Sequence, residues 1–111
     1  MHTPYLVVLT TFEKREDAER LARALIEQRH AACVQVLGPM TSIYRWNGKV
    51  ETAEEVLCLI KTRRALFPQV EETVTKLHPY EVPELIALPV EAGSASYLSW
   101  ITSETASALP D

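Results

Sequence analysis

The sequence has few of the residues and motifs on which enzymes and metal proteins commonly depend. Its 111 residues include only two cysteines and three glycines. Two cysteines are too few for a disulfide scaffold, and three scattered glycines form no phosphate-binding loop. The P-loop, GxSxG, HExxH and CxxC patterns are absent as well. Because no specific motif supports an enzymatic activity, we predict a non-enzymatic protein.

An excess of positive charge and long apolar runs are also lacking. The 11 Lys and Arg against 15 Asp and Glu give a formal net charge of −4, which disfavours nucleic-acid binding. No apolar run approaches the roughly 20 residues that span a bilayer. The N-terminus shows no basic region followed by a small-residue cleavage site. We therefore expect a cytoplasmic protein with reduced cysteines and with neither nucleic acid nor membrane as partner.

The composition that remains is typical of one globular domain. Hydrophobic residues make up 47% of the chain and charged residues 23%. A chain of 111 residues is long enough to bury a single core. We predict one domain over residues 1–111.

The first half of the chain predicts strand, helix and strand. Residues 5–11 form a short apolar run rich in branched side chains, typical of a buried strand. Residues 13–30 carry apolar side chains at helical spacing, with charges between them. Residues 31–37 predict a second strand, which Gly38-Pro39 interrupts before residues 41–46 resume it. A bend or bulge at the interruption would let one long strand continue.

The second half adds a hairpin, a helix, a strand and a final helix. Asn47-Gly48 is a strong signal for a tight hairpin turn, because a type I′ turn needs positive φ at both central residues. Residues 49–62 form the matching strand, and a helix begins near Leu66. Residues 84–90 predict the last strand, and a short helix follows Gly93-Ser94.

This order predicts an α+β fold of the ferredoxin-like βαββαβ type, with a long central hairpin and a short C-terminal helix. Two helices cover only one face of such a sheet, yet several strands are apolar at consecutive positions. A monomer would expose the second face as a large apolar patch. We therefore expect a closed homo-oligomer, with the aromatic side chains of Tyr44 and Trp46 at its interface.

One segment predicts a possible metal site. Residues 77–89 place His78, Glu81 and Glu84 within seven positions, among three prolines. One imidazole and two carboxylates suit several divalent metals, copper included. They fall short of a closed four-ligand set, so the binding would be weak.

Structural interpretations stand beside this one. A histidine before a proline often ends a helix, where its ring bonds the last helix carbonyls; this would make His78 a structural residue. Glu81 and Glu84 would then be surface or ion-paired groups. Cys33 and Cys58 are soft copper ligands in principle, but inside apolar strands a free cysteine usually behaves as a small hydrophobe.

The segments "ACVQV", "SIYRWNGKVE", "EEVLCLIKT", "HPYEVPELIALPV" and "YLSWI" together resemble the CutA family of divalent-cation tolerance proteins. The resemblance covers nearly the whole chain. It implies a ferredoxin-like homotrimer linked to tolerance of copper and other divalent cations, without an established enzymatic activity. Family positions associated with copper are Thr10, Leu77 and His78 here, and only His78 keeps a ligating side chain. The resemblance therefore implies weak metal binding by a homotrimer whose partners are divalent ions.

An alternative is a trimeric signalling or interaction module of the nitrogen-regulatory type, which binds a small ligand between subunits. That class relies on a long flexible loop and basic phosphate contacts, whereas the hairpin here is closed by a tight turn at Asn47-Gly48.

Overall fold

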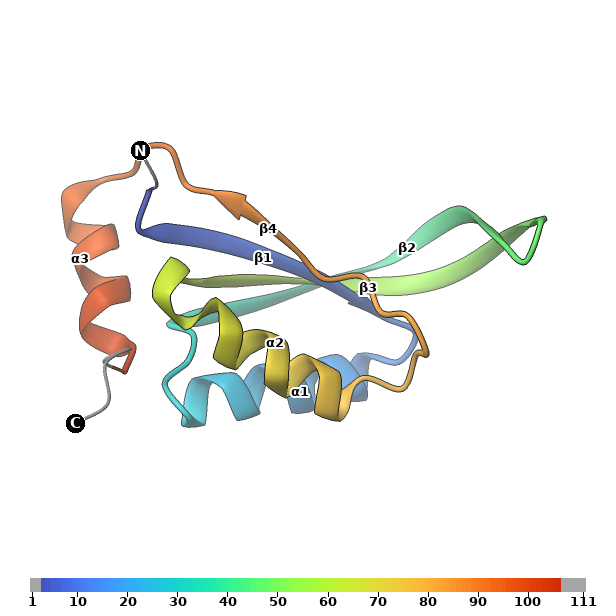
Figure 1. Ribbon diagram of the computed structural model, residues 1–111, viewed down its shortest axis with the longest axis horizontal. Helices are drawn as coiled ribbons and strands as arrows, with labels where there is room; N and C mark the ends of the chain where they lie inside the picture. The colour runs from blue at the N-terminus through green and yellow to red at the C-terminus, as the bar shows by residue number, and fades with distance from the viewer. Residues whose placement is uncertain (1–2, 107–111) are drawn as a thin grey trace.

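The computed structural model describes residues 3–106 and shows an α+β fold (Figure 1). Strands and helices follow one another in the predicted order. The elements are β1 (Tyr5–Phe12), α1 (Arg15–Glu27), β2 (Cys33–Trp46), β3 (Lys49–Arg63), the 3-10 turn η1 (Arg64–Leu66), α2 (Phe67–Leu77), β4 (Ile86–Pro89) and α3 (Ala95–Glu104). None of these helices is both long and apolar enough to cross a membrane.

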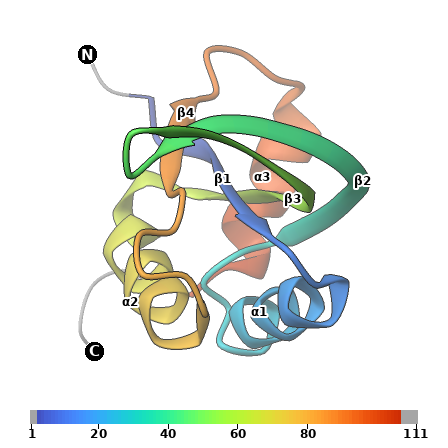
Figure 2. The same ribbon diagram turned by 90° about the vertical axis from the view of Figure 1, so that its right-hand side faces the viewer.

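The four strands form one antiparallel sheet in the order β2-β3-β1-β4. Helices α1 and α2 lie side by side against one face of this sheet (Figure 2). Alternate residues of β1 and β3 point toward these helices, because successive side chains of a strand point to opposite faces. The fully buried core side chains include Val8, Phe12, Leu21, Leu25, Ile60, Val70 and Val74.

The opposite face of the sheet, which we call the open face, is apolar as well. Register pairs Leu37 with Leu57 and Thr11 with Leu57, so these side chains share this face. The open face also carries Val7, Leu9, Leu59, Ile86 and Leu88, as the strand pairing shows. Leu37 is 52% exposed, and Ile86 and Leu88 are each 49% exposed. In the single chain the sheet therefore presents a broad apolar surface to water.

Strands β2 and β3 extend beyond the sheet as a two-stranded hairpin, which we call the arm (Figure 1). It makes the molecule elongated, with extents of 45 × 26 × 23 Å. Asn47 and Gly48 connect the strands with φ of 51° and 77°, as the predicted tight turn requires. A register shift between Leu37 and Met40 confirms the predicted bulge at Gly38-Pro39.

The bulge makes a substitution at Gly38 costly. Its φ is 144°, and an added Cβ would lie 2.9 Å from Val56 Cγ1 and 3.0 Å from the Glu55 carbonyl oxygen. We expect Gly38→Ala to lower the free energy of unfolding by about 2–3 kcal/mol, measured by urea denaturation. Gly48→Ala is the matched control, because Gly48 also has positive φ but an added Cβ there meets nothing within 4 Å. A loss of the same size at both positions would show that crowding at the bulge is not the cause.

Two elements are shorter at both ends than the sequence predicted. The last strand covers Ile86–Pro89 rather than residues 84–90, and it pairs with residues 6–9 of β1. The first helix covers Arg15–Glu27 rather than residues 13–30. Arg29 adopts a positive φ of 61°, which ends the helical path before the predicted boundary.

Helix α3 sits at the end of the molecule opposite the arm (Figure 1). Ser94 caps its first turn by accepting a hydrogen bond from the Tyr97 backbone N–H. At its other end, Arg29 Nη2 donates to the Ser103 carbonyl over 2.7 Å. The C-terminal helix is thereby fixed to the loop that follows α1.

Candidate functional site

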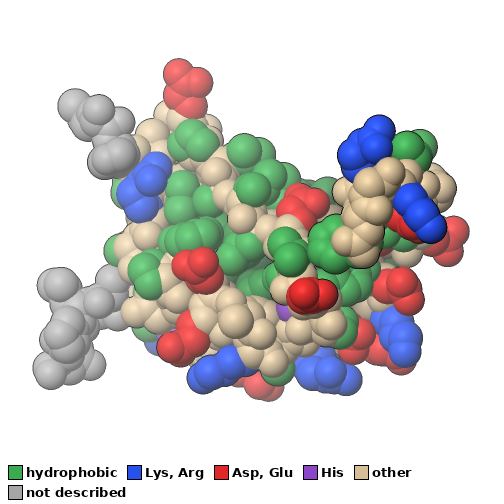
Figure 3. All heavy atoms as spheres, turned by 45° about the vertical axis from the view of Figure 1, so that its right-hand side comes forward, with side chains coloured by type: hydrophobic (Ala, Val, Ile, Leu, Met, Phe, Trp, Pro, Cys, Tyr) green, Lys and Arg blue, Asp and Glu red, His purple; other side chains and the backbone are tan. Residues whose placement is uncertain are grey.

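A cavity of about 600 Å³ lies where the arm leaves the body of the protein. Three parts of the chain form it: the arm, the end of β1 and the loop between α2 and β4. Figure 3 shows hydrophobic side chains across this side of the molecule, with acidic side chains among them. The lining residues are Thr11, Glu13, Ser42, Ile43, Tyr44, Trp46, Ala53, Glu55, Tyr80, Glu81, Val82 and Glu84.

The cavity is strongly acidic. Glu13, Glu55, Glu81 and Glu84 contribute four carboxylates, and the lining residues in the described part of the chain include neither Lys nor Arg. Glu13, Glu81 and Glu84 are exposed, whereas Glu55 is only 8% exposed. A concave wall that carries one sign of charge concentrates counter-ions, so the cavity favours cationic ligands over anionic ones.

Glu55 and Tyr80 are joined by a hydrogen bond across the cavity wall. The Tyr80 hydroxyl donates to Glu55 Oε2 over 2.7 Å. Burial raises the pKa of the Tyr80 hydroxyl above its usual range, and the bond to Glu55 adds to this effect. Tyr80 therefore stays protonated at neutral pH and remains a hydrogen-bond donor to the carboxylate.

His78 lies behind this wall, buried to 9% exposure at the C-terminal cap of α2. Its Nδ1 accepts a hydrogen bond from the Tyr80 backbone N–H over 3.2 Å. Nε2 must then carry the proton of the neutral ring, and it donates to the Thr11 carbonyl over 2.6 Å. The imidazole also stacks on Phe12 with ring centroids 4.1 Å apart. The prediction that the His78 ring bonds the last carbonyls of its own helix was wrong. The ring bonds a carbonyl at the end of β1 instead.

These contacts decide how far the predicted metal ligands fit a metal. Glu81 and Glu84 both line the cavity, but both ring nitrogens of His78 are already engaged. A metal would need an unprotonated ring nitrogen with a free lone pair. Within residues 3–106, no three His, Cys, Asp or Glu side chains are grouped so that they could hold a metal ion. The described residues therefore do not fit a tight copper site.

The cysteines do not change this conclusion. Cys58 is completely buried among core side chains, and burial raises the pKa of its thiol to about 11. A thiolate is the form that binds metal, so this residue is a poor ligand at neutral pH. Cys33 is half-buried at the start of β2. Both cysteines are unpaired, as the sequence predicted.

Tyr44 and Trp46, predicted as interface residues, line the cavity from the arm and are 44% and 43% exposed. The sequence did not indicate Glu55, which is the most buried carboxylate of the site. Its position in the sequence gave one signal. Glu54-Glu55 follow the alternating polar and apolar residues at the start of β3 and directly precede the apolar centre of that strand. The sequence also gives no indication that Tyr80 bonds Glu55, because the two residues lie 25 positions apart.

The fold defines the class of protein first. An antiparallel sheet with two helices on one face, built in the order βαββαβ, is the ferredoxin-like arrangement. The sequence then identifies the family. Residues 6–104 match the family model described as CutA1 divalent ion tolerance protein. The chain therefore belongs to the CutA1 family, and the resemblance seen in its sequence is confirmed.

Individual relatives agree with this assignment. The chain is 48% identical over 99 residues to the divalent-cation tolerance protein CutA of Thermus thermophilus. The match covers 89% of this chain and 96% of the relative. It is 51% identical over 90 residues to protein CutA of Mus musculus, which covers 81% of this chain. The chain spans about half the length of that mouse protein, since 51% of it is covered.

Solved structures give the same result for the fold. The divalent cation tolerance protein Cut A1 of Thermus thermophilus superimposes with a TM-score of 0.90 at 46% identity, covering 92% of this chain and 99% of that one. CutA1 of Shewanella sp. SIB1 superimposes with a TM-score of 0.93 at 38% identity, covering 96% and 100%. The α+β fold with its four-stranded antiparallel sheet is thus that of CutA1 structures.

Proposed function

We propose that this protein serves divalent-cation tolerance as a non-enzymatic cytoplasmic homotrimer that contacts copper and other divalent cations weakly. The match of residues 6–104 to the family model carries the proposal. Among the described residues, no hydrogen bond joins a Ser, Thr or Cys side chain to a His, Asp or Glu side chain that could act as its base. Two unpaired cysteines support a reducing, cytoplasmic setting.

The apolar open face supports the homotrimer. Soluble monomers rarely expose a contiguous apolar surface of this kind, so another copy of the chain is a natural cover. The arm adds Ile43 and Val50, which are 71% and 67% exposed in the single chain. Tyr44 and Trp46 stand on the same arm, and their exposed ring area supports the prediction that they contact a neighbouring protomer.

The acidic cavity supports weak cation binding. Glu81 and Glu84 offer oxygen ligands at its rim, and water would complete the coordination of a divalent ion held there. His78 contributes by holding the loop in place through its bonds to Thr11 and Tyr80. Such a site binds copper loosely, because it offers oxygen ligands in place of the nitrogen and sulfur that copper prefers.

A copper titration tests this assignment of ligands. We expect the double variant Glu81→Gln and Glu84→Gln to weaken copper binding several-fold by calorimetry, because it removes both rim carboxylates. The matched control is Glu71→Gln with Glu72→Gln, two exposed carboxylates of α2 outside the cavity. Equal weakening in both pairs would show that only net charge matters, and loss in Cys33→Ser instead would identify the thiol as the ligand.

The alternative of a trimeric signalling module of the nitrogen-regulatory type, whose small ligand would be a nucleotide, receives no support from the cavity. A nucleotide carries several negative charges, which proteins recognise with Lys, Arg or helix N-termini. The lining residues within the described part of the chain supply four carboxylates and no Lys or Arg. Calorimetry with ATP should therefore give no saturable binding.

A further inference from the structure

The imidazole ring of His78 joins three separate parts of the chain. His78 caps the end of α2, its Nε2 donates to the Thr11 carbonyl of β1, and its Nδ1 accepts from the Tyr80 backbone N–H. Tyr80 carries the connection onward, because its hydroxyl donates to Glu55 of β3 over 2.7 Å. The loop between α2 and β4 is therefore tied to the sheet through this ring.

The two hydrogen bonds of the ring respond differently to a proton. Nε2 already carries a hydrogen in the neutral ring, so an added proton must go to Nδ1. The bond from Nε2 to the Thr11 carbonyl is unaffected. At Nδ1, however, two N–H donors would face each other over the 3.2 Å that now joins the ring to Tyr80. Protonation therefore breaks the bond to the loop and leaves α2 attached to β1.

Few other hydrogen bonds hold this loop. Within the described chain, residues 79–85 make no backbone–backbone hydrogen bond, and two of them are prolines, which lack a backbone N–H. Their recorded hydrogen bonds are the two made by Tyr80. Val82 is 66% exposed, and Glu81 and Glu84 are exposed as well. A segment with so few contacts can open locally while the rest of the protein stays folded.

The charged groups that face the ring come from β3 and α1. They are Glu55 and Asp17, and the carboxylate of Asp17 pairs with Arg20 over 3.5 Å. Burial, the largest effect, lowers the pKa of His78, whereas its bond to β1 and these two carboxylates raise it. Glu13, which follows β1, is exposed and lines the cavity. The ring is thus neutral at neutral pH and has carboxylates nearby that favour its charged form when acid is added.

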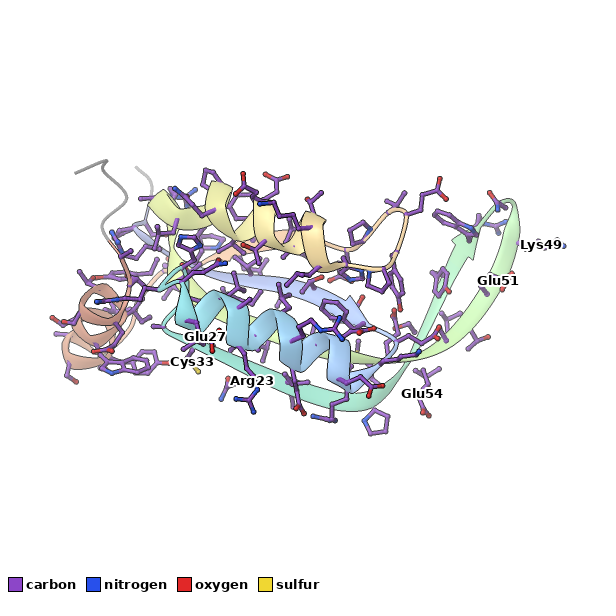
Figure 4. The ribbon with its side chains drawn as sticks, turned by 90° about the horizontal axis from the view of Figure 1, so that it is seen from below. Arg23, Glu27, Cys33, Lys49, Glu51 and Glu54 are labelled. Carbon is purple, nitrogen blue, oxygen red and sulfur yellow. The ribbon has the colours of Figure 1, made fainter. Side chains whose placement is uncertain are left out.

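Other charges near the loop are exposed. Lys76 of α2 is exposed and pairs with Glu72 over 3.8 Å, and Glu81 of the loop is exposed. Lys49 and Glu51 lie toward the tip of the arm, away from the end of α2, as Figure 4 shows. His78 is therefore the buried titratable group to which the loop is directly bonded.

We propose that His78 is an acid-operated latch: as the pH falls, the protonated ring releases Tyr80, the Tyr80 hydroxyl leaves Glu55, and residues 79–85 separate from β3 while the sheet stays folded. Protonation of a buried histidine is a common way to bias such a two-state element. The latch works without a bound cation and is independent of the proposed divalent-cation function.

NMR of the whole protein carrying isotope-labelled tyrosine tests the latch. The chain has 4 tyrosines, so few amide signals are present and Tyr80 can be followed alone. Between about pH 8 and about pH 5, on either side of the ordinary histidine pKa, we expect its amide shift to change in one step. Its solvent exchange, corrected for the intrinsic effect of pH, should rise about fivefold or more, as for one lost hydrogen bond. The Tyr5 amide of β1 should keep its shift.

Two variants assign the step to the ring. His78→Phe cannot titrate, so its Tyr80 amide should show no step and should have the released shift at every pH. Tyr80→Phe, followed with labelled phenylalanine, is the matched control. It removes the hydroxyl that bonds Glu55 but keeps the backbone N–H that bonds the ring, so the step should remain.

Three outcomes would overturn the proposal. The first is a wild-type Tyr80 amide without a step. The second is a step that persists in His78→Phe, which would assign it to another group such as Glu55. The third is a simultaneous change at Tyr5 and Tyr80, which would indicate unfolding of the sheet. If His78→Phe does not fold, the ring signals of His78 in the wild type replace it, and a midpoint different from that of the Tyr80 amide would contradict the latch.

Discussion

Replacing His78 by alanine is expected to lower the free energy of unfolding by about 3 kcal/mol. The substitution removes a buried ring that stacks on Phe12, with centroids 4.1 Å apart. It also leaves the Thr11 carbonyl and the Tyr80 backbone N–H without their partners, at 2.6 and 3.2 Å in the native chain. Urea denaturation at one fixed subunit concentration measures the loss, because assembly makes the midpoint depend on concentration.

Two further variants separate the causes of this loss. His78→Phe keeps a stacking ring but leaves both backbone groups unpaired, so we expect it to retain about 2 kcal/mol of the destabilisation. Lys76→Ala is the control on the same helix, since Lys76 is solvent-exposed. If His78→Ala unfolds at the same urea concentration as Lys76→Ala, the ring does not join α2 to β1 as described.

The same burial gives the stability a defined pH dependence. Burial lowers the pKa of His78 below its ordinary 6.5, and the nearby charges of Glu55 and Asp17 oppose this without overcoming it. Below pH 6.5 the unfolded chain therefore binds more protons at this residue than the folded one. The stability from the neutral ring is complete above about pH 6.5 and is lost as the pH falls through the window down to the folded pKa. His78→Phe should show a flatter profile across that window.

The second large effect is expected for Leu37→Glu, which should convert the proposed trimer to monomer. Leu37 is 52% exposed on the open face in the single chain, so a charge there costs an isolated monomer little. In a trimer covered through this face, the same carboxylate would be buried without a partner, at a cost of several kcal/mol per subunit. Sedimentation equilibrium measures the molecular weight.

The control for this experiment places the same charge on another surface. Ile26 is 41% exposed on α1, away from the open face, so Ile26→Glu should leave the assembly unchanged. A trimeric Leu37→Glu would show that the open face is not the interface. A wild type that is monomeric at micromolar concentration would contradict the trimer itself.

The sequence predicted the fold well because its signals are local and agree with one another. Periodicity identified α1 and α2, and Asn47-Gly48 identified the turn of the arm with its two positive φ values. The strands that are apolar at consecutive positions also predicted the open face, because successive side chains of a strand point to opposite faces of the sheet. The end of α1 was less predictable, because Arg29 follows the helix with a positive φ, a conformation that is uncommon for arginine.

The site was predicted only in part, since it depends on contacts between distant residues. His78, Glu81 and Glu84 lie close together in the sequence, but the imidazole turns inward to Thr11 while the carboxylates remain at the cavity rim. That direction is decided by the end of β1, which lies 67 positions earlier. Glu55 meets Tyr80 for a similar reason, because β3 and the loop after α2 converge only in the folded protein.

The position of β1 in the sheet has a consequence for synthesis of the chain. Strand β1 leaves the ribosome before both of its partners, since it pairs with β3 on one side and with β4 on the other. Tyr5 cannot pair with Arg63 until β3 has been made, and Leu6 cannot pair with Pro89 until β4 has been made. A strand with both edges unpaired is open to association with other chains. The nascent protein is therefore most exposed to aggregation before β3 has been made, when both edges of β1 are unpaired, and one edge stays open until β4 follows.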